Sequence, residues 1–197
     1  MFDTLDACLT DCRDRLIRAP RDRKSPLHTP VIVTADVDAR VMVLRAFDAA
    51  AWRLRLHTDT RAPKAAAIAA DPRVAVLFYD KGAKIQIRAR GLAEILRTGS
   101  EVDAAWNAST NFARRCYLGE GPGAGSDAPT SGLPPEFEGV EPDDAQLAPA
   151  RENFALLRIT LGALDWLYLA HTGHVRAQFT RTSDEAAARW EGRWVSP

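Results

Sequence analysis

The sequence predicts a mainly β protein, an antiparallel barrel with a few short helices. About seven segments have the strand composition or the two-residue alternation of β structure. Most of these segments are joined by short turns, which favours antiparallel pairing of consecutive strands. So many strands within 197 residues favour a barrel over an open sheet.

The composition indicates one domain over residues 1–197 and limits what it binds. Apolar residues make up 46% of the chain, enough for a sizeable core. Because 26 basic residues balance 26 acidic ones, we expect no nucleic-acid partner and no anionic membrane surface. There is no apolar run of about 18 residues, and the acidic N-terminus is unlike a signal peptide, so we expect a cytoplasmic protein.

The first half of the chain is predicted to alternate between helices and strands. Apolar side chains from Phe2 to Leu16 recur at three- and four-residue steps, which indicates an amphipathic helix over residues 1–19. An alanine-rich helix follows Pro63 and ends before Asp71-Pro72. Gly91 indicates a bulge after a strand. The strands expected here are residues 31–33, 41–44, 53–58, 74–78 and 84–90, with a turn at 36–38.

The second half begins with a helix and contains a long loop. Ser100 to Asp103 has the form of a capping box and predicts a helix to about Leu118. Residues 119–149 hold six of the 12 glycines and six of the 12 prolines, so they are predicted to form a loop. Strands are then expected at 154–161 and 164–170, joined by Gly162-Ala163, and at 175–181, followed by a short helix from Ser183 and a C-terminal tail.

No catalytic side chain and no metal site are predicted. The common nucleophile, zinc-protease and phosphate-loop signatures are missing. Among the four histidines only His171 and His174 are closely spaced, and a solvated hairpin explains them better than a metal. Three cysteines without paired spacing argue against a disulfide scaffold, and Cys8 and Cys12 are expected on the buried stripe of the first helix.

Basic residues within apolar strands are the strongest functional signal. Arg40 and Arg45 enclose the apolar segment 41–44. A guanidinium on an apolar strand is costly unless it meets an anion. Arg61 and Lys64 stand at the start of the predicted helix, where free backbone N–H groups and the helix dipole favour a phosphate.

The order of these motifs resembles the pyridoxamine 5′-phosphate oxidase family of FMN-binding split barrels. The resemblance covers about residues 28–96 and 154–197. It is carried by R-V-M-V-L-R at 40–45, H-T at 57–58, Lys64, D-P-R-V-A-V-L-F at 71–78, I-Q-I-R-A-R-G at 85–91, L-D-W at 164–166, H-V-R at 174–176 and W-x-x-x-W-V-x-P at 190–197.

The resemblance implies an antiparallel split β-barrel with short flanking helices, and a homodimer with an FMN site at the subunit interface. The chemistry would be hydride transfer from a small substrate to flavin N5. The cofactor-binding residues that it implies are Arg40, Val41, Met42, Val43, Leu44, Arg45, His57, Thr58, Arg61, Lys64, Gln86, Trp166 and Leu167. The substrate-binding residues that it implies are Arg45, Arg114, Arg115, His174 and Arg176.

Departures from the family pattern concern the substrate more than the cofactor. Pro63-Lys64 stands where the family has an Arg-Lys pair, and Gln178 stands where a further arginine is often found. The segment 111–117 is also unlike that of the true oxidase, so we expect poor oxidation of pyridoxamine 5′-phosphate. Two other hypotheses remain open: a flavin- or haem-binding barrel without turnover, and a barrel whose basic residues are only structural.

Overall fold

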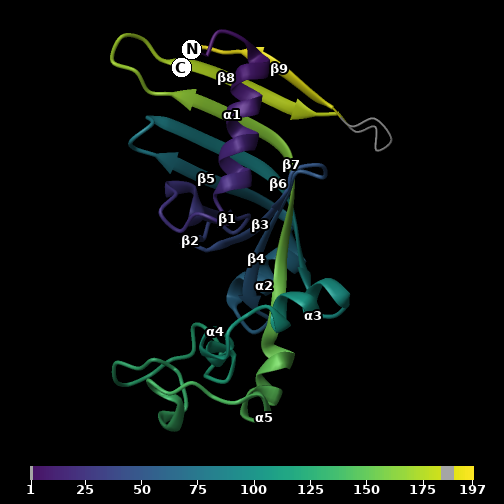
Figure 1. Cartoon of the computed structure of the whole chain (residues 1–197), viewed down its shortest axis with the longest axis vertical. Coiled ribbons are helices and arrows are strands. Elements are labelled where there is room, and N and C mark those ends of the chain that lie inside the picture. Colours follow the sequence, from purple (N-terminus) through teal and green to yellow (C-terminus); the bar gives the residue numbers. More distant parts are fainter. Residues whose placement is uncertain (1, 183–188) are drawn as a thin grey trace.

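Nine antiparallel strands form one continuous sheet in the computed structural model, which describes residues 2–182 and 189–197. The strands follow the order β2-β1-β5-β6-β7-β4-β3, while β8 pairs with β7 and β9 with β8 (Figure 1). Their bounds are β1 Val31–Thr34, β2 Ala39–Val41, β3 Leu44–Asp48, β4 Arg53–Asp59, β5 Arg73–Asp80, β6 Ile85–Leu96, β7 Phe154–Tyr168, β8 Val175–Arg181 and β9 Trp190–Trp194.

The connection between β2 and β3 closes the sheet into a barrel. These strands lie at the two ends of the seven-strand path, yet only Met42 and Val43 separate them in the chain. The sheet must therefore curl until its two edges meet. The long strand β7 pairs with β6 along one edge. Its other edge pairs first with β4 and then with β8, so the sheet divides along β7.

The inner face of the sheet holds the main core and is covered by helix α1 (Leu5–Arg18). The hydroxyl of Thr4 caps the helix by accepting from Ala7 N at 3.1 Å. Cys8, Cys12 and Leu16 are fully buried on the side that faces the strands, as predicted. The other elements are α2 Pro63–Ala70, α3 Ser100–Asn107, α4 Asn111–Arg114 and α5 Asp144–Leu147, with 3₁₀ helices η1 Pro26–His28, η2 Arg115–Tyr117, η3 Pro135–Phe137 and η4 Ala148–Asn153.

A second, smaller core lies between the start of β7 and the region we call the helical end, residues 100–153, at the opposite end of the molecule from β8 and β9 (Figure 1). Trp106, Tyr117 and Phe154 pack their rings together there, with centroids 5.2 to 6.1 Å apart. The guanidinium of Arg61 holds the following segment by donating to the carbonyl oxygen of Gly119 at 2.9 Å.

Four sequence predictions about the elements were wrong. Residues 41–44 are not one strand, because the chain leaves one sheet edge at Met42 and joins the other at Leu44. Residues 154–170 are not two strands, because β6 pairs along nearly the whole of β7 and carries it past Gly162. The C-terminal tail forms β9, which pairs with β8.

The fourth error concerns the helix predicted from Ser100 to Leu118. It ends at Asn107, and a new helix begins after Thr110, whose hydroxyl accepts from Ala113 N. The capping box is also absent, since Gly99 occupies the N-cap with a φ of 108° and no side-chain hydrogen bond. The short helix predicted from Ser183 lies outside the described residues. The helix at 63–70, the bulge at Gly91 and the strand at 175–181 are confirmed.

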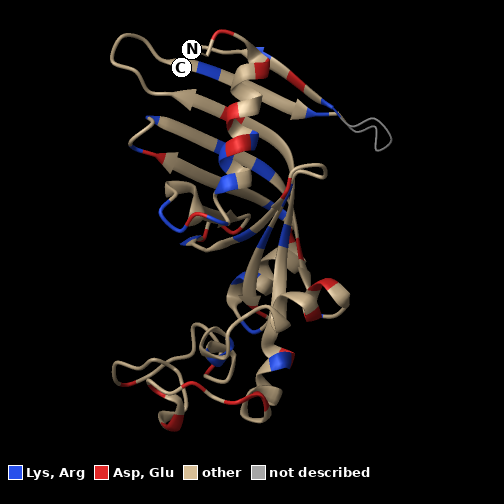
Figure 2. Ribbon diagram, viewed as in Figure 1, with Lys and Arg blue, Asp and Glu red and all other residues tan. Residues whose placement is uncertain are grey.

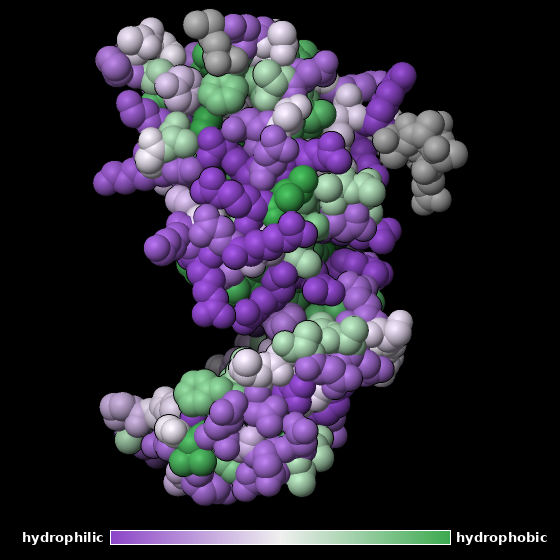
Figure 3. All heavy atoms as spheres, viewed as in Figure 1, coloured by the Kyte–Doolittle hydropathy of each residue, from purple (hydrophilic) through white to green (hydrophobic). Residues whose placement is uncertain are grey.

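The charges are spread over the whole molecule. Acidic and basic residues are interspersed along the elements (Figure 2), and the face that carries α1 is mostly hydrophilic with scattered apolar side chains (Figure 3). No helix in the described part of the chain has the length and apolar character needed to cross a membrane.

Candidate functional site

Two basic residues meet at the start of α2, in a group we call the β2–α2 cluster: Arg40 and Lys64 with Asp38 and Asp59. Arg40 donates to the hydroxyl of Thr34 at 2.9 Å and forms an ion pair with Asp38. Lys64 is half-buried in the first turn of α2. Burial and then repulsion from Arg40 lower the pKa of the Lys64 amine, while Asp59 and Asp38 act in the opposite direction.

The β2–α2 cluster fits a phosphate group. Lys64 forms no ion pair with any described residue. The N-cap Ala62 gives α2 no side-chain cap, and its first turn has no acidic residue. A half-buried ammonium at an uncapped helix start is a favourable place for an anion.

Arg61 and Thr58 are already engaged within the chain. Arg61 forms an ion pair with Asp59 at 2.7 Å and donates to the carbonyl oxygens of Gly119 and Tyr117. Thr58 is 4% exposed. The Thr58 hydroxyl donates to the carbonyl oxygen of Asp59 at 3.4 Å, so both predicted cofactor residues are bonded within the protein next to the cluster.

The segment between β2 and β3 has mixed exposure, because it crosses from one sheet edge to the other. Val41 is 64% exposed and Arg45 is exposed, whereas Leu44 is fully buried. Met42 and Val43 are half-buried. Val41 and Arg45 are thus exposed at the barrel seam, and Leu44 belongs to the core.

His57 is held as a neutral side chain. It lies in β4 with its ring edge-on to Phe154, centroids 5.0 Å apart. Burial, with the nearby positive charges of Arg45 and Arg55, lowers the pKa of His57 to about 4. A neutral imidazole beside Arg45 can donate or accept a hydrogen bond near pH 7 without adding charge.

Gln86, Leu167 and Arg176 form one row on the outer face of the sheet, the face turned away from α1. They are cross-strand neighbours, because Gln86 pairs with Leu167 and Leu167 with Arg176. Side chains of paired residues lie on the same face. Trp166 therefore points the other way: it is fully buried, and its indole N–H donates to Asp11 at 2.8 Å.

Arg40 lies on the opposite face from this row. Arg40 pairs with Ile32 of β1, and Ile32 pairs with Val76 of β5. Ile32 and Val76 are core residues of the inner face, so Arg40 shares that face. Gln86 and Arg40 are thus separated by the sheet within one chain.

The predicted substrate residues fall at two ends of the molecule. Arg114 is 9% exposed, and its guanidinium donates to the carbonyl oxygens of Trp106 and Asn107. Arg115 donates to the carbonyl oxygens of Phe137 and Val140. Both lie in the helical end, whereas the exposed His174 lies in the turn before β8, at the far end of the sheet.

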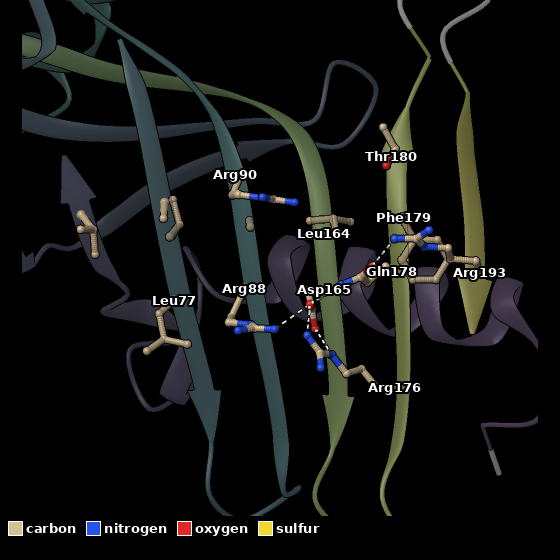
Figure 4. A pocket seen from close by; sticks show the side chains of 14 residues that line it. Leu77, Arg88, Arg90, Leu164, Asp165, Arg176, Gln178, Phe179, Thr180 and Arg193 are labelled. Atoms are coloured by element: carbon tan, nitrogen blue, oxygen red, sulfur yellow. Dashed lines mark hydrogen bonds and ion pairs between the residues drawn. The ribbon is translucent and has the colours of Figure 1, made fainter. Parts of the chain in front are cut away.

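A pocket of about 520 Å³ lies on the outer face across β5 to β9, and we call it the outer-face pocket. Figure 4 shows it with α1 behind the strands. Arg176 and Gln178 contribute to it, together with residues that sequence reasoning missed: Arg88, Arg90, Asp165 and Arg193. The sequence predicted the strand at residues 84–90 that holds Arg88 and Arg90, but only the strand register brings these two together with Asp165 and Arg193.

This antiparallel barrel, divided along β7, has the architecture of a split-barrel protein, and its basic cluster at the start of α2 is a favourable place for an anion. Residues 20–97 match the family model described as the pyridoxamine 5′-phosphate oxidase, FMN-binding domain. The family resemblance inferred from the sequence is therefore confirmed. The β2–α2 cluster and Gln86 lie within the matched residues.

Solved structures share this fold. A pyridoxamine 5′-phosphate oxidase-related, FMN-binding protein from Nostoc punctiforme has a TM-score of 0.71 at 23% identity, covering 95% of this chain and 96% of that one. PhzG from Burkholderia lata, in complex with tetrahydrophenazine-1-carboxylic acid, has a TM-score of 0.68 at 16% identity, covering 96% and 92%. No curated protein matches this chain.

Proposed function

We propose that this protein is an FMN-dependent oxidoreductase that works as a homodimer in the cytoplasm and oxidises a small substrate. The observation that carries the proposal is the β2–α2 cluster, which lies inside the segment that matches an FMN-binding domain. Two cations meet there at an uncapped helix start, and neither a metal nor a protein nucleophile is needed for flavin chemistry.

Each proposed residue has a distinct task. Lys64 and Arg40 would bind the phosphate, and the backbone N–H of Lys64 would assist them, since Pro63 at the first helical position has none. The exposed guanidinium of Arg45 would stabilise negative charge that develops on the flavin, next to a neutral His57. The chemistry that bound FMN supplies is acceptance of a hydride from the substrate.

The arrangement of one chain supports a site that is completed by a second chain. Gln86 and Leu167 lie on the outer face, and Arg40 on the inner one. The outer face also exposes apolar side chains, with Val41 at 64% and Tyr79 at 47%. Exposed apolar surface of this kind often marks an interface. We propose that Gln86 and Leu167 of one protomer face the β2–α2 cluster of its partner.

The test is to compare FMN with riboflavin, which lacks the phosphate. In Lys64→Ala and Arg40→Ala proteins, FMN should bind about tenfold to a hundredfold more weakly, because each loses a charge-assisted contact of roughly 1.5–3 kcal/mol. Riboflavin affinity should change little. The exposed Lys81 in the β5–β6 turn gives a matched control, Lys81→Ala, which should bind both as the native protein does.

Flavin fluorescence quenching measures both affinities, and the visible spectrum of the purified protein identifies the cofactor. Equal losses for FMN and riboflavin would remove Lys64 and Arg40 from the phosphate. A haem Soret band in place of flavin bands, or no FMN binding at all, would contradict the proposed function.

A further inference from the structure

The outer-face pocket combines an apolar floor with a basic rim. Its volume of about 520 Å³ is within the range of small-molecule sites. Its apolar part is formed by Val33 of β1 and by Ala75 and Leu77 of β5. The guanidinium groups of Arg88 and Arg90 from β6 and of Arg176 from β8 extend over the pocket (Figure 4). Arg193 from β9 completes the rim.

Among the described residues that line the pocket, Asp165 is the only carboxylate, and both of its oxygens accept hydrogen bonds. One of its oxygens accepts from Arg88 at 2.7 Å, from Arg176 at 2.7 Å and from Gln178 at 2.9 Å. Its other oxygen accepts from Arg176 Nε at 3.0 Å. These contacts offset the burial of Asp165 and keep the pKa of its carboxyl below the usual range, so it stays charged near neutral pH.

The other two guanidinium groups, those of Arg90 and Arg193, have no carboxylate partner among the residues that the structure describes. Arg193 donates to the neutral side-chain oxygen of Gln178 at 3.0 Å. Arg90 forms no side-chain hydrogen bond or ion pair within residues 2–182 and 189–197. Four guanidinium groups and one carboxylate leave the lining with a net charge of +3. Asp165 fixes Arg88, Arg176 and Gln178 in place, and Gln178 in turn holds Arg193, whereas Arg90 has no such partner among the described residues.

We propose that the outer-face pocket binds the anionic group of the substrate, a carboxylate or a phosphate monoester on an apolar body. Arg90 and Arg193 bind the anion directly, and Asp165 is a positioning residue that orients Arg88 and Arg176. The apolar body lies on Ala75 and Leu77. This inference rests on the proposed function, because it assigns a substrate class to the same outer face that carries Gln86.

Calorimetric titration of the FMN-loaded protein tests the proposal with benzoate, phenyl phosphate and the uncharged benzamide. At least one of the two anions should bind, and benzamide should not. Arg90→Gln and Arg193→Gln should each weaken anion binding about tenfold to a hundredfold. The control Arg18→Gln removes the same charge from an α1 side chain that is 69% exposed and should leave binding unchanged.

The two anions separate the sources of the charged group: tighter binding of benzoate indicates a carboxylate substrate, and tighter binding of phenyl phosphate indicates a phosphate monoester. The proposal is overturned if neither anion saturates, if benzamide binds equally well, or if Arg18→Gln causes the same loss. It is also overturned if the Arg90 and Arg193 variants change dimer dissociation and not anion affinity, because the arginines would then serve the contact between copies.

The same variants distinguish failure of this inference from failure of the proposed function. Arg90→Gln and Arg193→Gln should bind both FMN and riboflavin as the native protein does. Loss of FMN affinity alone would show that the pocket holds the cofactor's phosphate, and the substrate assignment would be wrong. If the native protein binds no FMN but still binds an anion, the proposed function fails while the anion site remains.

Discussion

Replacement of Gly91 by alanine should destabilise the protein strongly. A Cβ atom at Gly91 would lie 2.1 Å from the carbonyl oxygen of Thr160 and 3.1 Å from Cα of Leu161. Both are backbone atoms of β7, so no side-chain rotation can relieve the overlap, and β6 must separate from β7 at the bulge. Overpacking of this kind costs about 1–3 kcal/mol, and each lost ladder hydrogen bond adds roughly 0.5–1.5 kcal/mol.

We therefore expect Gly91→Ala to lower the free energy of unfolding by about 2–4 kcal/mol. Gly162→Ala is the matched control, because Gly162 lies on the paired strand with no atom within 4 Å of its added Cβ. The free energy of unfolding of that variant should rise by no more than about 1 kcal/mol, because alanine lowers the conformational entropy of the unfolded chain. Urea unfolding followed by circular dichroism measures both, and a Gly91→Ala protein within about 0.5 kcal/mol of native would refute the steric argument.

Three further predictions concern assembly, substrate and pH. Analytical ultracentrifugation of the FMN-loaded protein at micromolar concentration should show a dimer; a flavin-bound monomer would contradict the two-chain site. Oxidation of pyridoxamine 5′-phosphate should be more than about a hundredfold slower than by an authentic oxidase. Arg114 and Arg115 are bonded to backbone carbonyl oxygens, and the loss of two charged contacts to the substrate costs roughly 3–6 kcal/mol. Comparable oxygen-dependent turnover would show this to be wrong. Because folding lowers the pKa of His57 from 6.5 to about 4, the unfolded chain takes up its proton first, and His57 contributes a loss of stability as pH falls through that interval. His57→Gln should reduce the difference between urea midpoints at about pH 7 and pH 5, the exposed His174→Gln should not, and equal effects would exclude His57 as the source.

Much of the fold could be predicted because the local pattern and the long-range pairing agree. Pro63 and the alanines after it define α2, and Gly91 indicates the bulge that the close approach of Thr160 requires. Where the two levels disagree, the sequence misleads. Gly162 has the composition of a turn, yet pairing with β6 carries the strand through it. Ser100 has a capping side chain, but the positive φ of Gly99 places the N-cap one residue earlier.

The same distinction between local pattern and long-range pairing applies to the residues of the candidate site. Arg40 and Lys64 could be predicted as candidates because each stands beside a local signal, an apolar strand or a helix start. Trp166 and Leu167 are adjacent in sequence, and only strand register shows that Trp166 is buried while Leu167 faces outward. The outer-face pocket depends on the register of β5 to β9, which no local pattern contains.

The long strand β7 has a consequence for how the molecule unfolds. It pairs with β6 from Leu156 to Tyr168, while its other edge is shared between β4 and β8. One part of the sheet lies next to the helical end, and the other part is covered by α1. Both parts therefore share the strand β7, and no separate strand forms a boundary between them. Neither part can lose its pairing without disrupting the strand on which the other depends. The two hydrophobic cores are consequently expected to melt as a single cooperative unit, although they are separate clusters of side chains.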